Sequence, residues 1–492
     1  MTVLLLILIP AAAGGLAFFV RADRPRRALL VTTAAGHTSL TVSAWVCRPR
    51  PTPGGWFALD GLGLLFLSIT SVLFLAVSVY TLSYLRRERQ GGITDIEEGF
   101  LFDNAPEATF TACLLLFLAA MTLVTVSQHV GLLWVAVEAT TLASAPLIYF
   151  HRHHRSLEAT WKYLLICSVG IALALLGNFF LAVAASHPQA GTSGSSPSML
   201  FANLGSQATQ LHVPWLKAAF LLILVGYGTK MGLAPLHTWL PDAHSESPSV
   251  ISALLSGALL NCAFLGIVRT QQVCVAAGLG GFSRQLLVGF GLISMAVAAA
   301  FIVGQSDYKR MLAYSSVEHM GILSLGIGLG GAGVFGALLH AINHSLTKAM
   351  LFLIAGNILG TFRTKSTVEV RGVLRALPVS GVVWLAGLFA ITGSPPFGPF
   401  LSEFTILKAS LDEGRTIVAV IYLALLAAIF IGMATVALRM AQGEASREPQ
   451  REPLIAVLPP ALLGAGVLLL GIYIPPAIDN LLHETARALG GL

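Results

Sequence analysis

The stretch VPWLKAAFLLILVGYGTKMGLAPLHTWLPDAH, residues 213–244, decides how this chain folds. It begins as an apolar run and then places Lys230 just before the helix breakers Gly232 and Pro235. A lysine at the centre of a membrane costs roughly 2.5–3.5 kcal/mol, so it normally faces a partner or a wet cavity. Glycine and proline inside a spanning helix require other groups to satisfy the freed backbone. A charge beside a broken helix at mid-membrane depth is typical of ion sites, and His237 follows this break as a further candidate.

The composition favours a membrane protein along the whole chain. Of 492 residues, 55% are hydrophobic and 11% are charged, which is about half the charged fraction of soluble proteins. The net charge of +6 comes from arginines in the connections, so nucleic acid is not an expected partner. The five cysteines are scattered without a CxxC pair, so we expect neither an iron–sulfur cluster nor a disulfide framework. The first apolar run lacks a basic segment before it and predicts a retained helix rather than a cleaved signal.

We therefore expect an all-α integral membrane protein with about 14 transmembrane helices. Basic residues gather in the connections after odd-numbered helices, so the positive-inside rule places these in the cytoplasm and both termini outside. The basic connections lie at residues 21–27, 86–89, 152–162, 309–310, 363–375 and 439–451. The expected spans are residues 3–20, 28–46, 57–83, 108–127, 130–150, 160–185, 214–240, 248–269, 285–304, 311–330, 333–361, 378–410, 416–439 and 454–474.

Two more ionisable residues precede the broken helix. Glu138 lies eight residues into the fifth expected span, and intramembrane acids are usually functional. It could be a neutral carboxyl bonded to a neighbouring helix, but we expect it to pair with Lys230, so that the pair exchanges a proton when a third charge approaches. Lys162 lies near the cytoplasmic boundary, where it could either take part in function or extend its amino group to the surface.

A second cluster lies in DYKRMLAYSSVEHMGILSLGIGLGGAGVFGALLHAINHSLTKAMLFLIAGNIL, residues 307–359. His340, His344 and Lys348 recur every four residues and so share one helix face. This stripe predicts a hydrated proton path, with a polar packing seam as the alternative. A metal site is disfavoured because the sequence places no acidic ligand nearby. His319 and Lys309 extend the cluster, although Lys309 could also be a surface-reaching loop lysine.

The third cluster is ITGSPPFGPFLSEFTILKASL, residues 391–411. Its glycines and prolines break the twelfth expected helix, and Glu403 follows the break. The seventh and twelfth helices stand five apart, which is typical of inverted repeats around midplane ion sites. We therefore expect N-terminal helices at residues 1–107, a repeat at 108–269, an inverted repeat at 285–439, and a last helix with a short outward tail at 440–492.

These residues resemble the antiporter-like proton-pumping subunits of respiratory complex I, membrane-bound hydrogenases and cation/proton antiporters. The resemblance covers about residues 57–440 and rests on KMGLAPLHTWLPDAHSESPSVISALLSG, DYKRMLAYSSVEHMG and HAINHSLTKAMLFLIAGNI. Within this family, EATTLASAPLIYF, WKYLLICSVGIALALLGN and ALLNCAFLGIVR are most similar to the hydrogenase-4 component F branch.

The resemblance implies a role for each matching position. Glu138 and Lys230 would form a pair that Lys162 modulates, and Glu403 would be the exit residue. Lys309, His340 and His344 would connect them. Asn261 departs from the complex I pattern, because one complex I subunit carries a connecting lysine there. We also expect this chain, which ends soon after the fourteenth expected span, to lack the long lateral helix of the largest complex I relative.

The sequence thus predicts a proton-translocating subunit of a redox-driven complex in the bacterial inner membrane, most similar to hydrogenase-4 and formate hydrogenlyase complexes. An NADH–quinone oxidoreductase subunit and an antiporter or bicarbonate-uptake module without electron transfer are the alternatives. A purely structural anchor is disfavoured by the three charge clusters. No cofactor is expected in this chain, and partner membrane subunits with a soluble redox arm would carry iron–sulfur clusters and nickel–iron or flavin.

Overall fold

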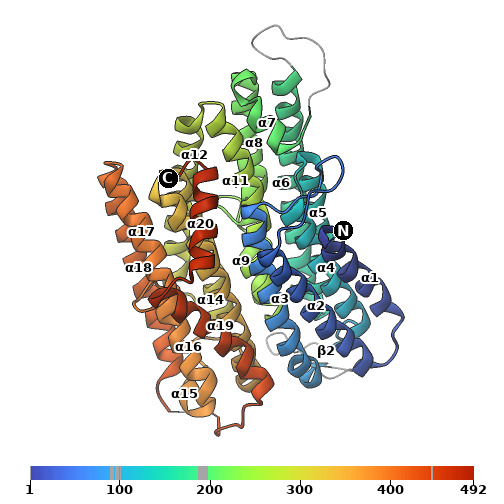
Figure 1. Cartoon of the computed structure of the whole chain (residues 1–492). Helices are drawn as coiled ribbons and strands as arrows, with labels where there is room; N and C mark the ends of the chain where they lie inside the picture. The colour runs from blue at the N-terminus through green and yellow to red at the C-terminus, as the bar shows by residue number, and fades with distance from the viewer. Residues whose placement is uncertain are drawn as a thin grey trace.

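A computed structural model describes residues 2–88, 93–94, 99, 101–186, 198–444 and 447–491. Arg89, which belongs to an expected basic connection, lies outside these residues. The described chain is a bundle of long helices with a common axial direction (Figure 1). Its helices are α1 (Thr2–Phe19), α2 (Asp23–Val46), α3 (Gly61–Arg87), α4 (Glu107–Val126), α5 (Val130–Ile148), α6 (His154–Ser186), α7 (Phe201–Ser206), α8 (Val213–Met231), α9 (Trp239–Glu246), α10 (Ser249–Leu254), α11 (Leu260–Ala276), α12 (Gly280–Ile302), α13 (Tyr308–Leu329), α14 (Ala332–Phe362), α15 (Val373–Ala376), α16 (Pro378–Ile391), α17 (Gly398–Asp412), α18 (Thr416–Ala441), α19 (Leu454–Ile472) and α20 (Pro476–Ala488).

Short elements fill two of the polar connections. Strands β1 (Ile93–Thr94) and β2 (Leu101–Phe102) pair antiparallel between α3 and α4. A 3-10 turn, η1 (Ala208–Gln210), follows α7, and a π-helical turn, η2 (Leu255–Leu259), joins α10 to α11. The strand β2 and α15 lie at the lower end of the bundle in Figure 1, and α7 lies at the upper end. We call the end that carries β2 and α15 the basic end, because the arginine-rich connections lie there.

The fourteen expected spans are confirmed by the helices that the structure places at those positions. Ten helices in the described chain are long and apolar enough to cross a membrane, counting α10 to α11 as one. The other four expected spans are α2, the α8–α9 pair, α13 and the α16–α17 pair. Each of these is either broken or unusually polar for a spanning helix.

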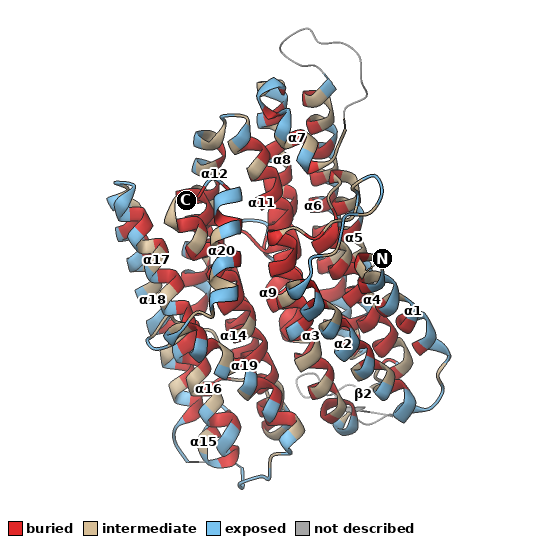
Figure 2. Ribbon diagram, viewed as in Figure 1, coloured by how far each residue is buried: buried red, intermediate tan, exposed pale blue. Residues whose placement is uncertain are grey.

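The outer helices carry apolar side chains on exposed faces. On α18, for example, Ile417 is 76% exposed and Ile431 is 65% exposed. Figure 2 shows that buried residues concentrate in the central helices, whereas α1, α2, α18 and α19 have exposed outer faces. Apolar surface of this extent needs lipid or partner subunits to cover it, which agrees with an integral membrane protein.

The first break separates α8 from α9 immediately after Lys230. Gly232 caps α8 with a positive φ of 85°, a conformation that a glycine adopts without strain. The freed backbone groups have side-chain partners: Trp239 Nε1 donates to the carbonyl of Thr229 at 2.8 Å, and Ala234 N donates to Ser294 Oγ at 2.9 Å. Side chains inside the bundle therefore satisfy backbone groups that the break frees at Thr229 and Ala234.

The second break separates α16 from α17 just before Glu403. Gly393 has a φ of +63°, and a Cβ atom there would overlap the Glu403 carboxylate. A Cβ atom on Gly398 would likewise overlap the Asn343 amide of α14. The backbone of this break thus lies so close to two polar side chains that only glycine fits at Gly393 and Gly398 without displacing them. The two breaks lie where the sequence predicted them, while the repeat boundaries at 108–269 and 285–439 stay a prediction.

The C-terminus after the last expected span, which we expected to be short and outward, contains a further helix. Residues 476–488 form the helix α20, which packs against α3 and α14. Leu481, Leu482 and Ala486 are buried in this contact. Arg48 in the α2–α3 connection holds the exposed side of α20 through both carboxylate oxygens of Glu484, at 2.7 and 2.6 Å. The C-terminal tail is therefore an ordered amphipathic helix.

Candidate ion-transfer site

Lys230 is fully buried at the end of α8, and hydroxyl groups hold its amino group. Its Nζ donates to Thr141 Oγ1 of α5 at 2.8 Å and to the Tyr163 hydroxyl of α6 at 2.6 Å. The same Nζ lies 4.4 Å from the centroid of the Tyr163 ring, a cation–π distance. The Tyr163 hydroxyl also contacts Ser144 Oγ at 2.7 Å. These partners satisfy the lysine without placing a carboxylate in direct contact with it.

Glu138 belongs to the same cluster but reaches Lys230 through an intermediate. Thr141 Oγ1 donates to Glu138 Oε2 at 3.1 Å while it accepts from Lys230. The Thr141 hydroxyl therefore bridges the two charged groups, which interact electrostatically across it. Glu138 itself is only partly buried. The expected Glu138–Lys230 pair is thus a bridged pair rather than a contact ion pair.

Lys162 lies apart from this cluster although it adjoins Tyr163 in the chain. Its side chain is 44% exposed and pairs with Glu158 at 2.7 Å and with Asp242 of α9 at 2.9 Å. Asp242 also pairs with Arg310 at 3.0 Å, so it ties α6, α9 and α13 together. The geometry gives Lys162 a bridging position beside the break, and its modulating role stays a prediction.

Lys309 lies at the start of α13 and is buried rather than extended to the surface. Its Nζ donates to the carbonyls of Ser245 at 2.9 Å and Ser247 at 2.7 Å, where α9 ends. A positive charge is favoured at a helix C-terminus, where the last carbonyls lack partners. His237 lies inside the first break, with a buried Nδ1 that has no protein partner. The structure places both predicted residues around α9.

His244 occupies the space between Lys309 and the lysine of α14. Its ring stacks on Phe352 at 5.0 Å, and neither ring nitrogen has a protein partner. It interacts electrostatically with Lys309 and with Lys348. The sequence did not reveal a role for His244, although this residue belongs to the stretch 213–244. Its imidazole is thus coupled to a lysine of α13 and to a lysine of α14.

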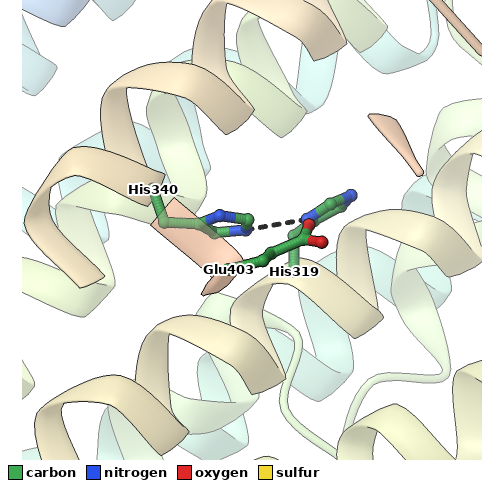
Figure 3. A group of neighbouring side chains, drawn as sticks. All are labelled: His319, His340 and Glu403. Carbon is green, nitrogen blue, oxygen red and sulfur yellow. Dashed lines mark hydrogen bonds between the residues drawn. The ribbon is translucent and has the colours of Figure 1, made fainter. Parts of the chain in front are cut away.

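The second and third clusters meet in one buried group of side chains. His319 Nδ1 of α13 lies 2.9 Å from His340 Nε2 of α14, and His340 Nδ1 lies 2.9 Å from Ser402 Oγ of α17. The Glu403 carboxyl lies beside His319 and His340, as Figure 3 shows. The rings of His319 and His344 are 5.0 Å apart between centroids. The predicted residues from three separate helices are thus brought together.

Lys348 lies one turn from His344 but directs its amino group toward α13. Its Nζ donates to the carbonyl of Leu312 at 2.6 Å and also contacts Ser315 Oγ. His344 Nε2 contacts the carbonyl of Ser256, in the π-helical turn, at 3.4 Å. Asn261, in the place of a family lysine, donates to Ser345 Oγ at 2.8 Å. The π-helical turn and the start of α11 therefore face α14 with neutral polar groups.

His319, His340 and Glu403 could also present ligand atoms to a metal ion, since one atom from each lies within 4.8 Å of the others. Our expectation that no acid is near the histidines was wrong, because the break carries Glu403 to them. However, two zinc-bound nitrogens would stand about 3.3 Å apart in tetrahedral geometry. The facing nitrogens are 2.9 Å apart and share a hydrogen bond. This arrangement suits proton exchange between imidazoles better than metal ligation.

These features define the class of protein: a multi-span membrane subunit with a buried chain of lysine, histidine and acid residues between two helix breaks. Residues 127–430 match the family described as NADH:quinone oxidoreductase/Mrp antiporter, transmembrane, and the chain belongs to that family. The hydrogenase-4 component F homolog of Methylacidiphilum infernorum is 36% identical over 91% of this chain and 92% of that protein. Hydrogenase-4 component B of Escherichia coli is 27% identical over 91% of this chain and 67% of that protein.

Solved structures share the fold at low sequence identity. A chain of the archaeal membrane-bound sulfane sulfur reductase superposes with a TM-score of 0.87 at 20% identity, covering 99% of this chain and 97% of that one. A chain of the Mrp complex from Dietzia gives 0.84 at 18% identity, covering 100% and 97%. A chain of respiratory complex I from Thermus thermophilus gives 0.81 at 21% identity, with complete coverage of both. These likenesses establish the architecture of an antiporter-like subunit.

Proposed function

We propose that this chain moves protons across the bacterial inner membrane as one subunit of a redox-driven complex of the hydrogenase-4 type. The observation that carries the proposal is the row of buried ionisable side chains that joins the two helix breaks. It begins at Lys230, which the Thr141 hydroxyl links to the partly buried Glu138, and ends at Glu403. A row of charges that is expensive to insert has no structural purpose that apolar residues would not serve better.

The proposed route uses protonation changes that each group can make in place. Lys230 exchanges a proton as the charge on Glu138 changes across the Thr141 bridge. Lys309, His244 and Lys348 would carry the proton toward α14, because they interact electrostatically in that order. His344, His319 and His340 would then pass it on, since an imidazole can accept at one nitrogen and donate from the other.

Buried polar atoms without a protein partner support a hydrated route. They are His237 Nδ1, both ring nitrogens of His244, the side-chain amide of Asn343, His344 Nδ1 and Glu403 Oε1. Such atoms normally form hydrogen bonds with ordered water. A buried polar atom that forms no hydrogen bond costs about 1–3 kcal/mol. Their succession along the clusters supports short water bridges where direct hydrogen bonds are missing.

The orientation and partners belong to the same proposal. The excess of arginine at the basic end supports a cytoplasmic location for that end, with both termini outward. Partner membrane subunits and a soluble redox arm would supply the iron–sulfur clusters and the nickel–iron centre. The identity to a hydrogenase-4 component F homolog over nearly the whole chain favours this context over an NADH–quinone oxidoreductase or a non-redox antiporter module.

Substitution of Lys230 tests the transport role. Lys230→Ala should leave the complex assembled while proton translocation by proteoliposomes collapses. Lys217→Ala is the matched control, because it removes the same charge from an exposed position on the same helix. Normal translocation by assembled Lys230→Ala would overturn the proposal. Co-purification from native membranes then decides the context: nickel supports a hydrogenase, flavin an NADH oxidoreductase, and neither an antiporter module.

A further inference from the structure

One buried carboxyl group has no part in the route described above. Glu318 lies in the middle of α13 and is 2% exposed. Its Oε2 atom has no hydrogen-bond partner among the residues that the structure describes. It directly precedes His319, so their side chains leave the helix about 100° apart and can face different neighbours. An acid buried at this depth is a candidate for function until a structural partner is found for it.

Glu318 occupies the place in the second half of the chain that Glu138 occupies in the first. The segments WVAVEATTLAS and AYSSVEHMGIL each contain a Val-Glu pair near the middle of a helix. The helix α5 is followed by α6 and the broken α8–α9 pair, and α13 is followed by α14 and the broken α16–α17 pair. Moreover, α5 packs against α6 and α9, while α13 packs against α14 and α17. Each acid therefore stands on the helix that faces a break.

The charged surroundings of Glu318 come from three other helices. It interacts electrostatically with Lys348 of α14, with Glu403 of α17 and with Tyr422 of α18. Lys348 bonds Ser315, which lies nearly one turn before Glu318 on α13. Glu318 thus interacts both with the Lys348 ammonium and with the second carboxyl, Glu403. A low-dielectric interior favours a group without net charge. One ionised carboxylate, one neutral carboxyl and one ammonium together make such a group.

An apolar cluster, which we call the exit cap, lies beyond both acids. Ile322 follows Glu318 by about one turn on α13, and Ile406 follows Glu403 by nearly one turn on α17. Both helices run away from the basic end at these positions. The exit cap consists of Val288, Met295, Ile322, Leu325, Leu329, Ile406 and Tyr422. The Tyr422 hydroxyl is buried and has no hydrogen-bond partner among the described residues, so the cap contains one polar group near the two acids.

We propose that Glu318 and Glu403 form a carboxyl pair that holds one transported proton in common behind the exit cap. This inference rests on the proposed function and adds a residue to it. In the transfer, the O–H bond of protonated Glu403 breaks as its proton passes to an intervening water, and that water gives up one of its own protons to form a new O–H bond on the Glu318 carboxylate. A water is needed because Glu318 Oε2 and Glu403 Oε1 have no hydrogen-bond partner among the described residues. The charge of the group is unchanged, because one carboxyl becomes ionised as the other becomes neutral. Hydration of the exit cap would then release the proton outward.

Translocation by the purified complex in proteoliposomes tests the pair. Glu318→Gln should lower the rate at least tenfold, and Glu318→Asp should keep part of it because the carboxyl remains. The matched control is Glu107→Gln, which also removes a buried carboxyl. Glu107 lies on α4, away from the route, and pairs with Arg27 at 2.7 Å. This control should retain translocation once its assembly is confirmed.

Infrared spectra across a pH titration supply a readout that a merely structural role would not move. The carboxylic acid C=O band assigned to the pair should change in Glu318→Gln and shift in Glu318→Asp. If Glu318→Gln fails to assemble, Glu318→Asp alone decides, and an unshifted band overturns the inference. If Lys230→Ala and Glu403→Gln abolish translocation while Glu318→Gln does not affect it, the inference fails and the proposed function stands. If none of the three affects translocation, the proposed function fails.

Discussion

Lys230 Nζ and the hydroxyl of Tyr163 are joined by a 2.6 Å hydrogen bond in the interior of the bundle. The lysine is therefore satisfied by neutral oxygens and an aromatic ring, while its nearest acid in the cluster, Glu138, is held one hydroxyl away. A contact ion pair would fix both charges firmly in a low-dielectric interior. The bridged arrangement leaves the charge on Lys230 responsive to a change on Glu138, which is what proton exchange requires.

The Thr141 bridge gives the first prediction. Thr141→Val keeps the shape of the side chain but removes the hydroxyl that joins Glu138 to Lys230. We expect translocation to fall by about tenfold, consistent with the loss of roughly 1–2 kcal/mol in a buried hydrogen bond. Thr141→Ser should restore most of the rate. The control is Thr140→Val, because the Thr140 hydroxyl bonds only within its own helix, to the carbonyl of Val137. Equal losses at both positions would refute a bridging role.

The second prediction concerns the electrostatic coupling of Glu138 and Lys230. At separations of about 4–7 Å and an effective dielectric near 20, Coulomb's law gives roughly 2–4 kcal/mol between unit charges. In a cycle of Glu138→Gln, Lys230→Met and the double variant, the double variant should be less impaired than the two single effects combined. The measured quantity is the translocation rate of each assembled complex. Additive effects would show that the two residues act separately.

The residues that sequence reasoning found and missed differ in a physical way. Lys230, His340 and Glu403 were evident because charged or imidazole groups in apolar runs are costly wherever they point. The role of Thr141 was not evident from the sequence, because threonine is common in helices and the role depends on the contact between α5 and α8. Glu318 was overlooked beside His319, although its own cost of burial was a sufficient signal.

The positions of the helices were predictable for a similar reason. Apolar length and helix breakers are properties of the local sequence, and both breaks lie where the glycines and prolines occur. The helix α20 was missed, because its amphipathic pattern is short and follows Pro475 and Pro476. Its stability depends on contacts with α3 and α14, which are distant in the chain.

The Arg48–Glu484 pair predicts a pH dependence at the end opposite the basic end. The hydrogen bonds from Arg48 hold the pKa of the Glu484 carboxyl below its ordinary value. A lowered folded-state pKa means that the pair stabilises the docked α20 at neutral pH. That contribution is lost as the pH falls below the ordinary pKa of a glutamate and then through the lowered pKa of Glu484 in the folded chain. Because both side chains are largely exposed, we expect at most about 1 kcal/mol.

Thermal unfolding of Glu484→Gln measures this contribution. The variant should be slightly less stable than the native chain near pH 7, and the difference should disappear under acidic conditions where Glu484 is protonated. The exposed Glu444 provides a control, and Glu444→Gln should show a smaller difference at neutral pH. A destabilisation by Glu484→Gln that is constant with pH would show that packing, rather than the ion pair, holds the helix.

The final prediction concerns the glycine that makes room for Glu403. Gly393 and Gly414 have similar positive φ angles, +63° and +70°, so alanine imposes a similar backbone strain of order 1 kcal/mol at both. The space around them differs: a Cβ at Gly393 would overlap the Glu403 carboxylate, whereas nothing lies within 4 Å of one at Gly414. Gly393→Ala must therefore displace the carboxyl from His319 and His340, or move the break itself.

We expect Gly393→Ala to reduce translocation nearly as much as Glu403→Gln, while Gly414→Ala keeps most of the activity. Comparing assembled complexes at matched protein content separates the steric effect on Glu403 from the shared backbone strain. A further check is Gly393→Ala combined with Glu403→Gln, which should be no worse than Glu403→Gln alone, since both changes remove the same function. If Gly393→Ala and Gly414→Ala impair translocation equally, the close contact between Gly393 and Glu403 is not what positions the exit carboxyl.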